Sequence, residues 1–453
     1  MALTYYEIGW YVVLILWLAY LPYGLAFLVN YVKNRHIFLY KPNGVFPRIG
    51  ATIVFQITTL SVTDNLDIVE RGIASIKRSA RELHLSSFKV VTVSDDPRDA
   101  STNVDADEAI VVPSSYRCNA VKKARSLNYA ALRYKERIRG LEDTWIFHID
   151  EESVVLPQTI EAIVKYIASE DGVLAEGPIL FPSTLSRNAL SGVADSIRSS
   201  SCYFCVSTIS GKSPPSHLHG SNLLIRADVE CEIGWENDKS IAEDQLFGYY
   251  AHDKYPRFGW HGGIILESSP SSISGLMRQR KRWVVGTLQN WKHMNARLKR
   301  ETGFRLAIWT TGFFATMVSI PLWILTVFYF VAGTLHLQVG TVPYLQPPFL
   351  TTGQVASSVL SGGMGAFHVS GNLLEVVLGV GAAASLAIWA FSYVLGFYLN
   401  HLYNTRAGLV RHTRDVLTLL LSLWFVGFLE NEPMVAGLIE FLQGKASWEV
   451  TPK

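Results

Sequence analysis

The sequence contains few charged residues, little excess charge of either sign and few cysteines. Only 17% of its 453 residues are charged, against roughly 25% in soluble globular proteins, which argues against a fully soluble protein. Its 40 basic and 38 acidic side chains leave a net charge of +2, whereas dedicated nucleic-acid binders carry a large basic excess, so we expect no nucleic-acid partner. Four cysteines are too few for a disulfide scaffold and fit a reducing cytosolic environment.

Two of the cysteines, Cys202 and Cys205, have the C-x-x-C spacing of half a zinc site. A structural zinc site needs four ligands. The other two cysteines, Cys118 and Cys231, do not form a second pair at ligand spacing, so we predict buried thiols rather than a zinc centre.

Long apolar runs lie at both ends of the chain. Residues 8–30 exceed the about 20 apolar residues that a spanning helix needs, and they lack the basic start and small-residue cleavage site of a secretory signal peptide. We therefore predict an N-terminal transmembrane helix within residues 1–32. Basic residues follow it directly, at Lys33, Arg35 and Lys41. By the positive-inside rule, the next segment is then cytoplasmic.

The second apolar region is predicted to be a transmembrane region over residues 303–443. Two of its stretches, 303–335 and 374–400, are each long enough to span a membrane. A last stretch, 415–443, is interrupted by Glu430, Asn431, Glu432 and Pro433. Because carboxylates are costly at membrane depth, we expect a kinked, re-entrant or paired segment there, and the number of crossings stays open.

Residues 45–276 hold most of the charges and are predicted to form a cytoplasmic α/β domain. Short β-branched or aromatic runs predict four strands, at 51–59, 88–94, 109–112 and 145–149. Between the first two, apolar residues from Val69 to Leu83 recur at steps of three and four, which predicts a helix with one apolar face. Alternating strands and helices favour a mostly parallel, doubly wound sheet, which binds ligands at the carboxyl ends of its strands.

Acidic residues stand at two of these strand ends. Asp95 and Asp96 follow the second strand, and Asp150, Glu151 and Glu152 follow the fourth. On an extended segment Asp150 and Glu152 project to one side. Two carboxylates there suit Mg²⁺ or Mn²⁺ held together with substrate phosphates, which predicts a nucleotide diphosphate ligand. The alternative is an acidic turn that caps a helix over residues 153–166.

Asp244 marks a second acidic site, far along the chain. It stands at the expected start of a helix, where a carboxylate can cap the first turn. It could instead act as a general base that takes the proton of an acceptor hydroxyl. The residues alone leave both interpretations open.

The segment 277–300 carries eight Lys or Arg in 24 residues, immediately before an apolar stretch. This pattern predicts an amphipathic helix at the anionic cytoplasmic leaflet, in contact with membrane lipids. The segment also offers cationic groups that can bind phosphate and an aromatic ring that can stack on a sugar, at Gln279, Arg280, Arg282 and Trp283. One helix can serve both purposes.

Taken in order, these features resemble the membrane-integrated family 2 glycosyltransferases, whose motifs are an aspartate after the second strand, K-A-x-x-L-N, D-x-D, T-E-D and Q-x-x-R-W. The corresponding residues here are Asp95 and Asp96, 123–128, 150–152, 242–244 and 279–283, and the ending WEVTPK, in a predicted cytoplasmic tail at 444–453, is similar as well. The phrases DTWIFHIDEES, IAEDQLFGYYA and LMRQRKRWVVGT look most like the egghead family, β-1,4-mannosyltransferases that use GDP-mannose and a glycolipid acceptor.

The resemblance implies a GT-A fold for the α/β domain, inversion at the anomeric carbon and a set of site residues. Asp244 would be the catalytic base. The nucleotide sugar would be bound by Asp95 or Asp96, Lys123, Asp150, Glu152 and Arg282, with Asp150 and Glu152 also holding Mg²⁺ or Mn²⁺, and the acceptor by Glu243, Gln279 and Trp283. Glu152 stands where the family motif has its second aspartate, and Ala242 where it has threonine.

We therefore expect an integral membrane enzyme with a cytoplasmic catalytic domain. It would transfer a sugar in one displacement from a nucleotide diphosphate sugar, GDP-mannose or a UDP-sugar, to a lipid-linked or saccharide acceptor. Two alternatives stay open. Q-x-x-R-W is also frequent in processive synthases of cellulose, hyaluronan or related glucans, whose membrane helices would line a channel for the polymer. A membrane transporter or scaffold with a noncatalytic α/β domain would show no turnover.

Overall fold

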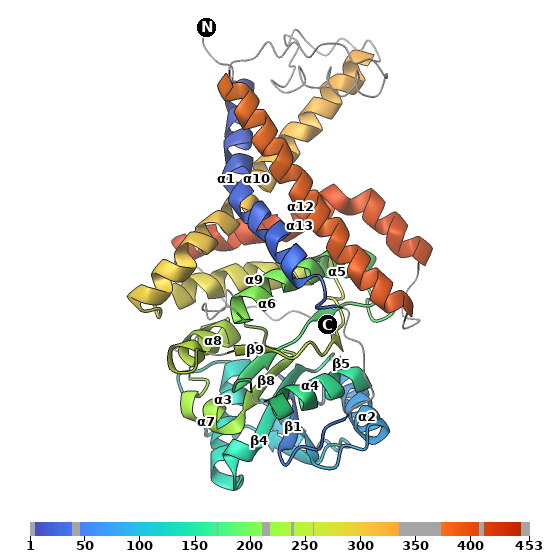
Figure 1. Ribbon diagram of the computed structural model, residues 1–453, viewed down its shortest axis with the longest axis vertical. Helices are drawn as coiled ribbons and strands as arrows, with labels where there is room; N and C mark the ends of the chain where they lie inside the picture. The colour runs from blue at the N-terminus through green and yellow to red at the C-terminus, as the bar shows by residue number, and fades with distance from the viewer. Residues whose placement is uncertain are drawn as a thin grey trace.

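A computed structural model describes most of the chain, and its α/β domain lies below a set of long apolar helices (Figure 1). The described residues are 5–38, 46–169, 171–210, 218–236, 240–256, 258–334, 373–406 and 412–444. Lys41, the segment between the second and third predicted spans, and nearly all of the predicted tail lie outside them.

The core of the α/β domain is a seven-stranded sheet in the order β3-β2-β1-β4-β8-β6-β9. Its strands are β1 (Thr52–Thr59), β2 (Phe88–Ser94), β3 (Glu108–Val111), β4 (Thr144–Asp150), β6 (Leu174–Glu176), β8 (Leu223–Arg226) and β9 (Phe258–Trp260). The first four are parallel neighbours and match the four predicted strands to within one residue at each end, while β8 pairs antiparallel with both β4 and β6. The expected mostly parallel sheet is confirmed.

Helices cover both faces of this sheet because side chains alternate along each strand. Phe55 and Ile57 of β1 pack with α2 (Leu66–Glu82) and α4 (Pro157–Ser169) on one face. Val54 packs with α3 (Lys123–Arg137) and α7 (Ala227–Ile233) on the other. The apolar stripe predicted between the first two strands is the buried face of α2.

The helix predicted from residue 153 begins later than expected. Residues Val154–Val155 form a short strand, β5, and α4 starts at Pro157. Proline favours the first position of a helix because its missing N–H has no partner to lose there. β5 belongs to a three-stranded sheet with β10 (Ile265–Leu266) and β7 (Ile179–Leu180). This small sheet brings a late segment of the chain beside the end of β4.

Three helices lie between the sheet and the apolar helices: α5 (Ala189–Ile197), α6 (Cys202–Ser210) and α9 (Ile273–Trp291) (Figure 1). The prediction of one interfacial helix over 277–300 is wrong in its bounds. α9 begins earlier and ends at Trp291, and residues from Ala296 onward already belong to the long helix α10 (Ala296–Thr334). The remaining helices of the domain are α8 (Glu243–Lys254) and the short 3-10 turns η1 (Pro97–Ser101), η2 (Leu141–Asp143) and η3 (Arg198–Ser201).

The apolar region contains α1 (Tyr5–Asn34), α10, α12 (Leu373–Arg406) and α13 (His412–Leu442). Within the described residues, Ile8–Asn34 and Val377–Thr405 are each long and apolar enough to cross a membrane. The two parts of α13, His412–Ser422 and Phe425–Leu442, pass the same test only when they are counted together as one span, and they meet at a bend of 63°. The bend precedes Glu430 and Pro433, where the sequence placed the interruption.

The long helices pack against one another through aromatic residues and leave apolar side chains exposed. Trp17 of α1 lies against Trp389 of α12, and its indole N–H donates to Ser319 Oγ of α10 at 2.8 Å. Val29 of α1 and Leu421 of α13 are among many large apolar side chains left exposed on these helices. Exposed apolar surface of this extent fits contact with lipid.

Candidate active site

A cavity of ≈ 1170 Å³ lies between the carboxyl ends of the central strands and the apolar helices. Eight of the predicted site residues line it: Lys123, Asp150, Glu152, Glu243, Asp244, Gln279, Arg282 and Trp283. Its wall continues onto α1, α12 and α13 through residues such as Tyr23, Trp389 and Glu430. The two acidic segments, almost a hundred positions apart in the sequence, therefore open into one space.

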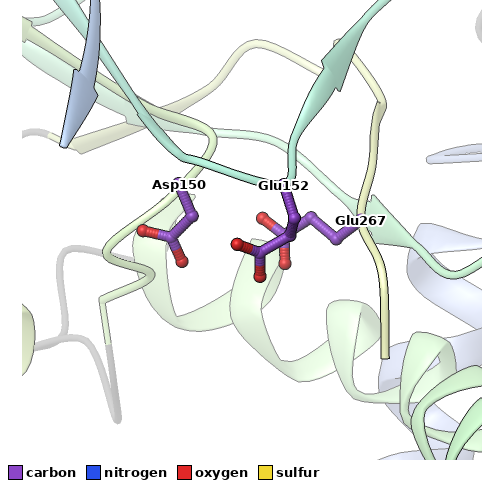
Figure 2. A group of neighbouring side chains, drawn as sticks. All are labelled: Asp150, Glu152 and Glu267. Atoms are coloured by element: carbon purple, nitrogen blue, oxygen red, sulfur yellow. The ribbon is translucent and has the colours of Figure 1, made fainter. Parts of the chain in front are cut away.

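Three carboxylates form an acidic cluster in this cavity: Asp150 at the end of β4, Glu152 just beyond it and Glu267 just after β10 (Figure 2). One oxygen from each lies within 4.8 Å of the others. In the described part of the chain, this is the one group of three or more His, Cys, Asp or Glu side chains placed to hold a metal ion. Hard oxygen donors in this number suit Mg²⁺ or Mn²⁺ with water and phosphate completing the shell.

The backbone between Asp150 and Glu152 is not the extended segment that the sequence suggested. The Ser153 N–H donates to the Asp150 carbonyl at 3.1 Å, so residues 150–153 form a turn. The turn, rather than strand alternation, brings the Asp150 and Glu152 carboxylates together. Glu267 was missed because β10 is only two residues long, too short to give a strand signal.

Lys123, the first residue of α3, connects this acidic cluster with the second acidic site. Its ammonium donates to the Asp150 carboxylate and, at 3.1 Å, to the carbonyl of Gly220. Burial lowers the pKa of Lys123, but the Asp150 and Glu243 carboxylates outweigh it and hold the pKa above its ordinary value. Lys123 is therefore a fixed cation at neutral pH.

Asp244 lies in the first turn of α8, half-buried on the cavity wall. Ala242 is the N-cap residue, and Asp244 accepts from the Gln245 N–H at 2.8 Å, so it supports the start of the helix without being its cap. Burial and the neighbouring Glu243 carboxylate raise the pKa of Asp244 to about 7, although Lys123 opposes the rise. A carboxyl group poised near neutral pH is suited to accept a proton.

The start of α8 is held against α9 by a close contact of two small residues. A Cβ atom on Gly286 of α9 would lie 2.5 Å from Cβ of Ala242 and 2.9 Å from its backbone nitrogen. Only glycine permits this approach, and a side chain larger than alanine at position 242 would press on it. The α9 residues Gln279, Arg282 and Trp283 line the same cavity as Asp244.

Asp95 and Asp96 lie at the end of β2 but do not line the cavity. Asp95 forms an ion pair with Arg125. Asp96 caps η1 by accepting from the Arg98 backbone N–H at 2.9 Å, and its carboxylate also binds the Arg98 guanidinium. These bonds hold the pKa of Asp96 well below its ordinary value. Contact of either residue with a nucleoside remains a prediction.

Two ionisable residues next to the site have surroundings that the sequence did not predict. Glu176, at the end of β6, is fully buried, and burial raises its pKa to about 8. It accepts the backbone N–H of His219, next to Gly220. Arg280 is fully buried as well, although the sequence indicated a cation in contact with phosphate or the lipid surface. Neither position gives a local signal, because the burial comes from elements distant in the sequence.

The cysteines are free thiols. Cys202 and Cys205 lie buried at the start of α6, and burial raises the pKa of Cys202 to about 12. Metal-binding cysteines need to be thiolates, which burial in apolar surroundings disfavours. The burial of both side chains agrees with the prediction of buried thiols.

Comparison with known proteins connects this site to a family. Residues 145–352 match the family model "Glycosyl transferase family group 2". The chain is 27% identical over 256 residues to β-1,4-mannosyltransferase egh of Drosophila melanogaster, covering 53% of each chain. It is 26% identical over 235 residues to β-1,4-mannosyltransferase bre-3 of Caenorhabditis elegans, covering 49% of each. The chain thus matches about half the length of these curated relatives.

Among solved structures, the mannosyltransferase PcManGT of Pyrobaculum calidifontis, in complex with GDP-Man and Mn²⁺, superposes with a TM-score of 0.46 at 13% identity. That likeness covers 84% of this chain and 98% of the other. TarS of S. aureus gives a TM-score of 0.34 at 10% identity, covering 87% and 92%. The matched family region begins in β4, the strand that ends in Asp150, and includes both acidic sites and α9. Residues 145–352 are thus similar to the family 2 glycosyltransferases, and the chain resembles the egghead-type β-1,4-mannosyltransferases.

Proposed function

We propose that the protein is an inverting membrane glycosyltransferase that moves a hexose from a nucleotide diphosphate sugar to a lipid-linked or saccharide acceptor and forms a β-glycosidic bond. Mannose from GDP-mannose is the first donor to test, because the egh and bre-3 relatives are β-1,4-mannosyltransferases. The observation that carries the proposal is the single cavity lined both by Asp244 and by the acidic cluster of Asp150, Glu152 and Glu267.

The chemistry assigned to this cavity is a direct displacement. Asp244, in its ionised form, takes the proton of an acceptor hydroxyl as the oxygen attacks the anomeric carbon from the side opposite the nucleotide. One displacement with no covalent intermediate inverts that carbon. Arg282, on the same cavity wall, offers a guanidinium to the departing diphosphate.

Asp150, Glu152 and Glu267 are the residues that would hold Mg²⁺ or Mn²⁺. The fit rests on three hard carboxylate oxygens that lie close enough to share one ion. Such an ion, when bound, would neutralise charge on the diphosphate. Glu152 and Glu267 are both buried, so their charges benefit from a cation at this place.

The shape of the cavity supports an acceptor at the membrane. It extends from the acidic residues to Tyr23 of α1, Trp389 of α12 and Met434 of α13, so a sugar headgroup can reach Asp244 while its carrier stays near the apolar helices. We place the α/β domain on the cytoplasmic face, because Lys33 and Arg35 follow the apolar run of α1 and basic residues favour that side. Membrane lipids then surround the helices.

A donor panel tests the function. Purified full-length protein in lipid nanodiscs is incubated with GDP- and UDP-hexoses, Mg²⁺ or Mn²⁺ and an extract of membrane glycolipids, and intact masses of the products are measured. We expect a mass gain of one hexose on a lipid acceptor, with GDP-mannose the best donor. A ladder of products would instead identify a processive synthase. Donor binding without turnover of any sugar would support a noncatalytic membrane protein and contradict the proposal.

A further inference from the structure

Arg280 of α9 is fully buried, although it belongs to a run of basic residues. Its guanidinium donates to both carboxylate oxygens of Glu430 in α13, from Nε at 2.9 Å to each and from Nη2 at 2.6 Å. Nη2 also donates to Asp195 of α5 at 2.7 Å, and Asp195 accepts from Arg198 at 3.1 Å. Two cations and two anions are thus joined across α5, η3, α9 and α13.

Stability alone is a poor reason for this buried network of charges. Removing charged groups from water is costly, and well-packed apolar residues in their place often give an equally stable or a more stable protein. What a bidentate arginine–carboxylate pair supplies is geometry, because the planar guanidinium fixes both distance and orientation of its partner. The network therefore fixes α9 relative to α13 at the level of Glu430.

Asp195, Arg198 and Glu430 lie on the cavity wall, and Arg280 behind them contacts two further cavity-lining residues, Gln279 through a hydrogen bond and Trp283 through its ring. The guanidinium carbon of Arg280 lies 4.4 Å from the centroid of the Trp283 ring, and that of Arg198 lies 4.2 Å from it. Both distances are within the range of a cation–π contact, which strengthens as water is excluded. Trp283 itself lines the cavity, whereas Arg280 does not. Arg280 can therefore influence a bound ligand only through its neighbours.

We propose that Arg280, held in place by Glu430 and Asp195, is a positioning residue that keeps Trp283 in the orientation needed to bind the acceptor sugar. Through Glu430, the placement of helix α13 then sets the affinity for the acceptor and not that for the nucleotide. This inference rests on the proposed transfer reaction and on Trp283 as part of the acceptor site.

The test uses a double variant, Arg280→Met with Glu430→Gln, which removes one charge of each sign and leaves Asp195 paired with Arg198. Full-length protein in nanodiscs is assayed with the donor and acceptor that the wild type turns over. We expect the acceptor KM to rise about tenfold, while the donor KM and the rate of donor hydrolysis by water stay within about twofold. Arg280→Lys keeps the positive charge but lacks the planar guanidinium that binds a carboxylate through two nitrogens, so it is also expected to raise the acceptor KM.

A matched control lies on the same two helices. Lys281 of α9 and Glu440 of α13 form an ion pair at 3.2 Å, and neither residue lines the cavity. Glu440→Gln is expected to leave both KM values unchanged.

An unchanged acceptor KM in the double variant would overturn the inference. Equal increases in the donor KM and the acceptor KM, together with a lower melting temperature, would also overturn it, because that is the result expected of a purely structural network. If the wild type transfers no sugar at all, the proposed function fails and this inference fails with it, an outcome distinct from both.

Discussion

Lys123, the first residue of α3, donates a hydrogen bond to Asp150, the last residue of β4. The same ammonium binds the Gly220 carbonyl, and a Cβ atom on Gly220 would lie 2.8 Å from Oδ2 of Asp244. One cation therefore stands between the acidic cluster and the proposed base. Its charge opposes the rise in the pKa of Asp244 and lies beside the place where an anionic diphosphate would bind.

Replacing Lys123 by methionine should move the pH dependence of transfer. Because the Lys123 charge lowers the pKa of Asp244, its loss should shift the acid limb of kcat/KM upward by about 1 pH unit. The profile is measured between pH 5.5 and 9 with saturating metal. Lys135→Met, at an exposed position on the same helix, serves as the control and should keep the wild-type profile. An unmoved limb in Lys123→Met would mean that this cation does not act on the base.

The pKa of about 7 for Asp244 gives a direct expectation for the wild type. A base must be ionised to accept a proton, so kcat/KM should rise with pH below about 7 and level off above it. Asp244→Asn cannot accept the proton and should lose about 10²- to 10⁴-fold in kcat, while calorimetry shows that GDP or UDP still binds. Asp253→Asn, an exposed change on the same helix, should behave as wild type. Transfer that survives Asp244→Asn would remove the residue from the role of base.

Glu267 should matter for the metal as much as the two residues found from the sequence. The Glu267 carboxylate completes the cluster with Asp150 and Glu152. Loss of a residue that only hydrogen-bonds a metal ligand typically lowers metal affinity about 10- to 100-fold. Glu267→Gln should weaken Mn²⁺ binding by at least this factor, because it removes a ligand itself. Calorimetric titration of Mn²⁺ into the protein with GDP present measures this without activity. Glu142→Gln, exposed at the opposite end of β4, is the matched control. Equal affinity in both variants would exclude Glu267 as a ligand.

Buried Glu176 should make the protein less stable as the pH rises. Its pKa is about 8 when folded, against an ordinary value of 4.5, so between these values the folded state holds a proton that the unfolded state has lost. The stabilisation that protonated Glu176 contributes to the folded state is fully present below pH 4.5. It decreases as the pH rises above 4.5 and is lost as the pH passes through 8.

Glu176→Gln, which has no proton to lose, should flatten that dependence. The melting temperature, followed from pH 5 to pH 8.5 in one detergent, should fall by several degrees less in Glu176→Gln than in the wild type. Glu136→Gln, an exposed carboxylate on α3, should retain the wild-type slope. Parallel slopes for all three proteins would show that Glu176 is ionised in the fold at neutral pH.

The elements that local periodicity encodes were predictable. β-branched residues at 52–59 and 88–94 and the apolar stripe of α2 give strand and helix signals within a short window, and the apolar run of α1 is long enough to be recognised by itself. The acidic residues after β4 were predictable as well, because parallel strands present their carboxyl ends to ligands. These features depend only on neighbours along the chain.

Three features depended on the tertiary structure. Glu267 joins Asp150 only because the short strands β5 and β10 pair, and two-residue strands have no periodicity to detect. Arg280 was expected to contact phosphate or the lipid surface, whereas in the fold it binds Glu430, 150 positions later. Asp95 and Asp96 follow a strand as predicted, yet Arg125 and Arg98 bind them away from the cavity. The sequence determined which segments are strands, helices and apolar spans, because that information is local. Which charges share one low-dielectric space was decided by contacts between distant segments, and those contacts set the pKa values and the partners of each group.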